Sequence, residues 1–151
     1  MPGAESHEAH CERLRAIFRL GTVRPSAIHE CLVDTGAYLT ILPQEVWAPY
    51  RTEIRWLRHV QGQPLPAWLT QVRGMTGGDG IRCAPGMIEM ELVGLDGNNL
   101  PRRSVLALFA YDNGALKQSV LGLGGYVYAG RRLEIEYDDR RAWICESGPL
   151  E

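Results

Sequence analysis

The most constraining feature of the sequence is a short acidic loop between two apolar runs. Residues 31–33 are apolar, the motif Asp34-Thr35-Gly36 follows, and a second apolar run at residues 39–42 ends at a proline. Apolar runs of this length, bounded by turn residues, are typical of buried strands. The pattern therefore predicts a carboxylate on a tight loop that two buried strands hold from both sides.

A carboxylate held in this way can act as a general base on water, because base catalysis requires a fixed geometry. Gly36 has no Cβ, so another backbone or side chain can approach Asp34 closely. The hydroxyl of Thr35 can form a hydrogen bond that fixes the loop. The alternative interpretation is an ordinary hairpin turn, since Asp and Gly are both common turn residues.

Over Asp34-Thr35-Gly36-Ala37 the chain resembles the retropepsin-like aspartic proteases, whose catalytic loop has these four residues between apolar strands. The resemblance implies an all-β fold, a single-domain acid-protease barrel with one short helix. It implies that Asp34, Thr35 and Gly36 are catalytic and that Ala37 and Tyr38 contact the substrate. The implied activity is that of an aspartic endopeptidase, which needs no metal or cofactor. The alternative is a catalytically silent module of this fold that binds a partner or dimerises.

Aspartic-protease chemistry requires two carboxylates in one site, and the 151-residue chain contains one such motif. Its other Asp-Gly and Asp-Asn turns lack an apolar run before them. A chain of this length, 45% apolar, has material for one core, to which Leu32 and Val120 are expected to belong. The resemblance therefore implies a homodimer in which each chain contributes one Asp34.

A glycine-rich hairpin tip is expected at residues 74–80, where four of seven residues are glycine. Strands are predicted on both sides, at residues 68–73 and 81–83, and the chain then continues as a strand at residues 87–92. Retropepsin-like proteins carry a flap over the substrate at this place in the chain. The alternative is a surface hairpin without a role. The resemblance implies substrate contacts from the residues Gly74, Met75, Thr76, Gly77 and Gly78.

The rest of the chain is predicted to consist mainly of strands separated by turns. One helical turn is expected at residues 43–47, where a proline suits the first position. Residues 50–66 are expected to form a short basic surface strand. Alternating and apolar patterns predict strands at residues 14–20, 27–33, 104–111 and 119–121 and a final hairpin at residues 131–145. The resemblance implies that the strand at residues 119–121 passes beside the Asp34 loop and that the final hairpin contains the dimer contact.

Two positions depart together from the pattern of the retroviral members. Those proteins place an acidic residue after the catalytic motif and an arginine after a later glycine, and the two residues pair near the site. Here the positions are Tyr38 and Leu123. Because both charges are absent, no buried unpaired charge results, and the fold is expected to tolerate the change. The change leaves the peptide preference and the dimer geometry open.

Residues 1–13 form a polar segment, expected to be mobile, before a predicted domain at residues 14–146, and residues 147–151 form a short tail. In the first segment His7, His10 and Cys11 are candidate metal ligands, because positions i and i+3 share one helical face. Clusters of this kind are more commonly part of a solvated tail, so no metal site is assigned.

The charge and the cysteines limit the kinds of partner. The net charge is −2 and the basic residues are spread along the chain, which argues against nucleic acid as the main partner. The four cysteines are isolated from one another, which predicts reduced thiols. No apolar run has membrane-spanning length and residues 1–10 are not signal-like, so we expect a cytoplasmic protein without membrane contact. The expected partners are a second copy of the chain and a peptide or protein substrate.

Overall fold

The computed structural model describes residues 14–22, 27–73, 80–111, 116–136 and 141–146. Within these ranges the chain consists mainly of strands and turns, with one short α-helix. This arrangement confirms the predicted all-β fold class. The predicted polar segment at residues 1–13, with its candidate metal ligands, and the tail at residues 147–151 lie outside the described residues.

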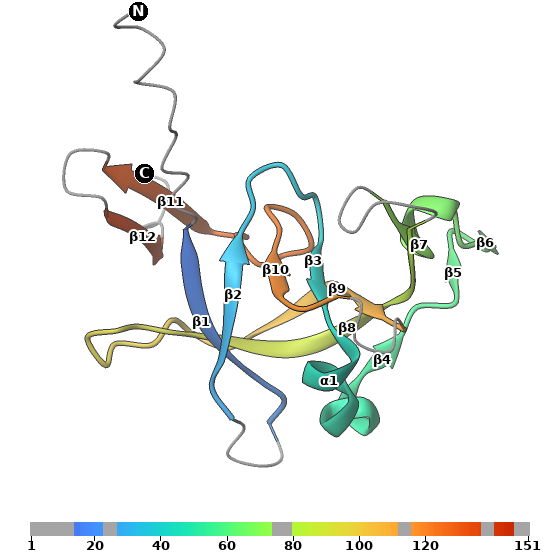
Figure 1. The fold of residues 1–151 in the computed structure, drawn as a ribbon, viewed down its shortest axis with the longest axis horizontal. Coiled ribbons are helices and arrows are strands. Elements are labelled where there is room, and N and C mark those ends of the chain that lie inside the picture. Colours follow the sequence, from blue (N-terminus) through green and yellow to red (C-terminus); the bar gives the residue numbers. More distant parts are fainter. Residues whose placement is uncertain (1–13, 23–26, 74–79, 112–115, 137–140, 147–151) are drawn as a thin grey trace, which may run out of the picture.

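Six strands form a closed barrel in the order β1, β2, β10, β3, β9, β8 and back to β1 (Figure 1). Two of the pairings, β2 with β10 and β3 with β9, are parallel, and the other four are antiparallel. Every strand of the ring has two neighbours, so the ring has no free edge. The bounds are Arg15–Leu20 for β1, His29–Val33 for β2, Thr40–Leu42 for β3, Ile81–Val93 for β8, Arg103–Ala110 for β9 and Ser119–Leu121 for β10.

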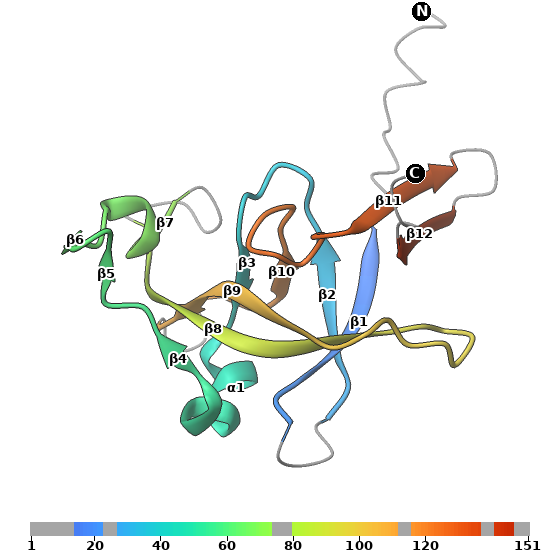
Figure 2. The same cartoon turned by 180° about the vertical axis from the view of Figure 1, so that it is seen from behind.

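The long strand β8 contains both of the strand stretches predicted after the hairpin tip, residues 81–83 and 87–92. It runs without a break beside β9 (Figure 2), and so includes residues 84–86, for which no strand is predicted. These residues include a proline and a glycine, which are common breakers of strands. In the structure, a Cβ added at Gly86 would lie only 2.9 Å from a side-chain carbon of Ile54. The glycine therefore permits close packing against the neighbouring segment rather than a turn.

The predicted helical turn after Pro43 is present as α1, Gln44–Trp47. The chain then continues as a 3-10 helix at Ala48–Glu53, where the sequence analysis expects the start of a basic surface strand. Pro49 lies in the first turn of this helix, and its fixed φ favours helical backbone. The prediction of a basic strand is therefore wrong. Short strands follow instead, namely β4 (Arg55–Trp56), β5 (His59–Val60) and β6 (Gln63–Pro64).

The outgoing strand of the predicted glycine-rich hairpin is shorter than expected. Residues Ala67–Leu69 form a 3-10 helix after Pro66, whose carbonyl accepts the Leu69 N–H at 3.0 Å. Only β7, Gln71–Val72, pairs with the start of β8. The turn that follows Pro66 thus replaces the first half of the predicted strand at residues 68–73.

Two clusters of buried side chains form the core. The first includes Trp47, whose indole N–H donates to the Ala110 carbonyl at 3.0 Å. The second includes Val120, as predicted, but Leu32 belongs to neither cluster and is half-buried. Successive side chains of a strand point to opposite faces, and on β2 it is Cys31 that points into the core. The expectation that Leu32 is a core residue is therefore wrong.

The predicted final hairpin is present as β11, Arg131–Glu136, and β12, Arg141–Glu146, which form a separate two-stranded sheet beside the barrel (Figure 1). A cluster of charged side chains connects this hairpin to the barrel. The Arg131 side chain is 1% exposed and its Nε donates to Glu146 at 2.7 Å. Arg103 of β9 donates to the other carboxylate oxygen of Glu146 at 2.8 Å. These ion pairs join the hairpin to the barrel.

Candidate active site

Strand β10 passes between the two strands that carry the Asp34 loop. It pairs in parallel with β2 and antiparallel with β3, as the resemblance implies. The Asp34 N–H donates to the carbonyl of Leu121 at 3.0 Å, which extends the ladder to the loop itself. Leu121 is fully buried, whereas Asp34 is exposed. The backbone of Asp34 is thus anchored in the core while its carboxylate faces the surface.

The loop at Asp34 is a tight turn held by backbone groups. The Gly36 N–H donates to Oδ1 of Asp34 at 2.9 Å, and the Ala37 N–H donates to the Asp34 carbonyl at 3.1 Å. The Thr35 side chain is exposed, and none of the hydrogen bonds found within the described part of the chain involves its hydroxyl. The carboxylate is therefore oriented by Gly36, and the expected bond from Thr35 is not formed to any of the described residues.

The segment after β10 presses directly against the loop. A Cβ added at Gly122 would lie 2.5 Å from the backbone carbonyl of Leu39, so only glycine fits. The Gly122 N–H donates to Oγ1 of the buried Thr40 at 3.3 Å, and the Leu123 N–H donates to the Ala37 carbonyl at 3.0 Å. Thr40 is not among the site residues predicted from the sequence. The one feature of the sequence that could have identified Thr40 is its hydroxyl group within an otherwise apolar strand.

A groove of about 370 Å³ opens beside Asp34. Its floor is apolar and comes from the second core cluster, including Ile41, Leu108 and Val120. Polar groups at the groove come from Asp34, Gln71 and Arg73. The remaining lining residues are Gly36, Ala37, Tyr38, Leu39, Trp68 and Val72. A mainly apolar groove with few polar groups is typical of a ligand site.

Two exposed aromatic side chains meet at this groove. The rings of Tyr38 and Trp68 lie edge to face, with centroids 6.3 Å apart, and their exposed fractions are 69% and 57%. The sequence analysis named Tyr38 but not Trp68. These residues are 30 positions apart and no local pattern predicts that they meet. Of the residues predicted to contact substrate, Ala37 and Tyr38 line the groove beside Asp34.

The stem of the predicted flap borders the same groove. Val72 at the end of β7 and Arg73 after it both line the groove, and β7 pairs with the start of β8. The stem of the predicted hairpin therefore lies beside the Asp34 groove. The predicted flap contacts from Gly74, Met75, Thr76, Gly77 and Gly78 lie outside the described residues and stay predictions.

The cysteines of the described residues are free. Burial raises the pKa of the Cys31 thiol to about 12 and that of Cys83 to about 11, so both stay protonated and unreactive near neutral pH. Across the described ranges no three His, Cys, Asp or Glu side chains are grouped as metal ligands. None of the helices within these ranges is long and apolar enough to cross a membrane.

Comparisons with known proteins bear on the fold. The chain matches no protein-family model and no curated protein. Among solved structures, it is similar to the protease of EIAV in complex with the inhibitor HBY-793, with a TM-score of 0.41 and 16% identity over 76% of this chain and 86% of that chain. It is also similar to a retropepsin-like aspartic protease from Rickettsia conorii, with a TM-score of 0.54 and 15% identity over 92% of this chain and 86% of that chain. On this second similarity, the chain has the retropepsin-like fold that the sequence predicts.

Proposed function

We propose that the protein is an aspartic endopeptidase that acts as a homodimer. The observation that carries the proposal is the position of Asp34. Its backbone is anchored by a hydrogen bond to the buried Leu121, and its carboxylate lines a groove with an apolar floor. A fixed carboxylate next to space for a ligand is what general base catalysis on water requires.

Each chain contributes one Asp34, so catalysis needs a second copy. Two close carboxylates share one proton, because two like charges in contact resist joint ionisation. The ionised carboxylate takes a proton from a water molecule between them, and the protonated carboxylate polarises the carbonyl of the scissile peptide bond. Water adds directly to the carbonyl carbon, and the proton held by the carboxylates then passes to the amide nitrogen as the C–N bond breaks, which releases an acid and an amine. No covalent intermediate, metal or cofactor takes part.

The groove suits an extended peptide. Its apolar floor accepts apolar side chains, and Tyr38 and Trp68 provide rings at its sides. The flap at Gly74 to Gly78 would close over the peptide and exclude bulk solvent, leaving only the attacking water at the reacting atoms. The hairpin stem at β7 supports this role because it borders the groove.

The final hairpin is the proposed dimer contact. A two-stranded sheet is marginally stable alone, and pairing with the hairpin of a second copy would extend it. Ile135 on β11 and Trp143 on β12 are 44% and 40% exposed, which supplies apolar surface for such a contact. The exposed hydroxyl of Thr35 is also available to a second copy. We place the protein in the cytoplasm, because buried free thiols suit a reducing compartment.

The test compares the parent chain with Asp34→Asn. Both proteins, shown by sedimentation to be dimeric, are incubated with an unbiased peptide mixture from acidic to neutral pH, and the products are identified by mass spectrometry. Asp96→Asn, the same change in an exposed turn, is the matched control. Cleavage by the parent and by Asp96→Asn but not by Asp34→Asn supports the proposal. A dimeric parent that cleaves nothing contradicts it and favours a binding module of the same fold.

A further inference from the structure

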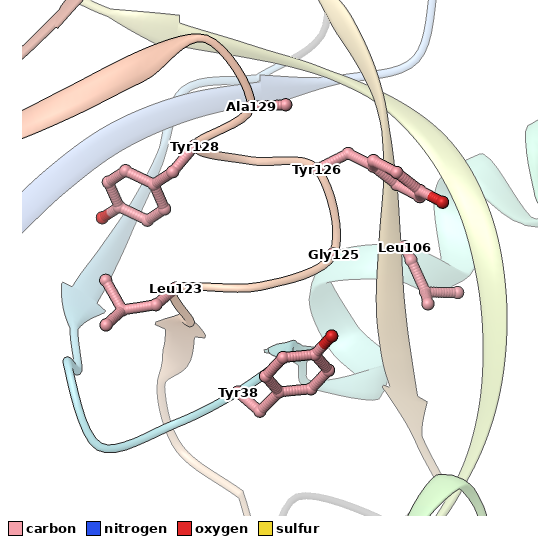
Figure 3. Close-up of a pocket in the computed structure, with 7 residues that line it drawn as sticks. All are labelled: Tyr38, Leu106, Leu123, Gly125, Tyr126, Tyr128 and Ala129. Atoms are coloured by element: carbon pink, nitrogen blue, oxygen red, sulfur yellow. The ribbon is translucent and has the colours of Figure 1, made fainter.

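A second hollow, of about 430 Å³, adjoins the Asp34 groove. Tyr38 lines both, so the two hollows meet at this residue. Figure 3 shows the chain from Leu123 to Ala129 running around one side of the hollow, with Tyr38 across from Tyr126. The other lining residues are Leu106, Gly125 and Tyr128. None of the side chains that line this hollow carries a charge at neutral pH.

Tyr126 is held at this hollow in an unfavourable backbone conformation. Its φ is +73°, in the left-handed region that bulky side chains rarely adopt, and its side chain is 61% exposed. Gly125 before it also has a positive φ, +69°, and a Cβ there would overlap the Leu106 carbonyl oxygen. The Leu106 N–H donates to the Gly125 carbonyl at 2.8 Å. The turn is therefore fixed against β9, and it presents the Tyr126 ring to the hollow instead of the core.

The exposed apolar side chains gather around the two hollows. Of nine large apolar side chains that are exposed among the described residues, four line one hollow or both, namely Trp68, Tyr38, Leu123 and Tyr126. Clustered exposed aromatic side chains mark binding surfaces, whereas single ones are ordinary. Strained residues also concentrate at ligand sites, where the surrounding structure holds them. Both observations point to a ligand at the hollow beside Tyr126.

We infer that this hollow binds an aromatic or large aliphatic side chain of the same peptide that lies across Asp34. The inference rests on the proposed function, because it takes a peptide as the occupant of the groove. In an extended peptide, residues two apart point the same way and are about 7 Å apart, so one chain can place side chains on both sides of Tyr38. A charged side chain is disfavoured, because no charged lining group pairs with it.

Binding to the inactive Asp34→Asn protein tests the inference without requiring cleavage. The probes are octapeptides in which each position in turn is Ala, Phe, Leu, Glu or Lys. Their dissociation constants are measured for Asp34→Asn alone and for Asp34→Asn combined with Tyr126→Asn. Asparagine tolerates the left-handed region, so the second variant removes the ring and keeps the turn, and its thermal midpoint checks this. Leu95→Ala, at a side chain that is 93% exposed and lines neither hollow, is the control.

We expect one peptide position at which Phe binds about 10-fold more tightly than Ala or Glu, a preference that Tyr126→Asn abolishes and Leu95→Ala retains. The same preference in both proteins, or no position that favours Phe, would overturn the inference. Loss of the dimer in Tyr126→Asn would also overturn it, by assigning the surface to a second copy. Cleavage of the selected peptide by the parent reports separately on the proposed function.

Discussion

Replacing Gly122 with alanine tests how closely the segment after β10 approaches the Asp34 loop. The new Cβ would lie 2.5 Å from both the carbonyl carbon and oxygen of Leu39, where about 3.4 Å or more is normal van der Waals contact. These are backbone atoms in the core, which cannot rotate away as a side chain does. One of the two segments must therefore move by roughly 1 Å.

This movement has a cost that the structure allows us to estimate. Overpacking of a core typically costs about 1–3 kcal/mol. The movement also stretches the hydrogen bonds from Gly122 to Thr40 and from Leu123 to Ala37, each worth about 0.5–1.5 kcal/mol. We expect a loss of about 3 kcal/mol in the free energy of unfolding. With a urea dependence of about 2 kcal/mol per molar, the midpoint should fall by about 1.5 M.

Urea unfolding of both proteins at equal concentration measures this shift. Gly97→Ala is the control, because Gly97 has a φ of +86° but no neighbour within 4 Å of its added Cβ. Alanine there should cost about 1 kcal/mol from its backbone conformation alone. A loss for Gly122→Ala no greater than that for Gly97→Ala would refute the close approach of the segment after β10 to the Asp34 loop.

Three further predictions concern stability. Val120→Ala should lower the free energy of unfolding by about 2 kcal/mol and Leu32→Ala by about 1 kcal/mol or less, because only Val120 is buried. Equal losses for the two variants in urea unfolding would contradict this. The Arg131 and Arg103 guanidinium groups lower the pKa of Glu146. The stability that the Glu146 carboxylate contributes is therefore fully present above the ordinary pKa of glutamate and is lost as pH falls through the lowered pKa of the folded state. Glu146→Gln should flatten the acid side of a curve of stability against pH. Burial lowers the pKa of His29 below 6.5, so stability should fall as pH drops below 6.5, and His29→Phe should remove this dependence in thermal unfolding between pH 5 and 7.

The barrel and the Asp34 loop could be predicted because their signals are local. The apolar runs on both sides of Asp34 specify two strands, and the apolar run that ends at Gly122 specifies the third strand beside them. The resemblance then supplied the order of these strands in space. The similarity to a solved retropepsin-like structure confirms the fold that follows from them.

The errors arise where a contact distant in the sequence overrides a local signal. No strand is predicted at residues 84–86, yet β8 continues through them, and Gly86 leaves the space that the Ile54 side chain needs. The pairing of Trp68 with Tyr38 and the positive φ of Tyr126 depend on how separate segments pack. No periodicity or turn residue in the sequence indicates either one.

The measurement that tests the central claim most directly is the activity of mixtures of parent and Asp34→Asn chains, equilibrated at constant total concentration. If the site needs one Asp34 from each chain, only dimers of two parent chains cleave peptides, and activity follows the square of the parent fraction. An equal mixture should then keep about one quarter of the parent activity. About one half, on a linear dependence, would contradict the shared site, because it would mean that each chain acts alone.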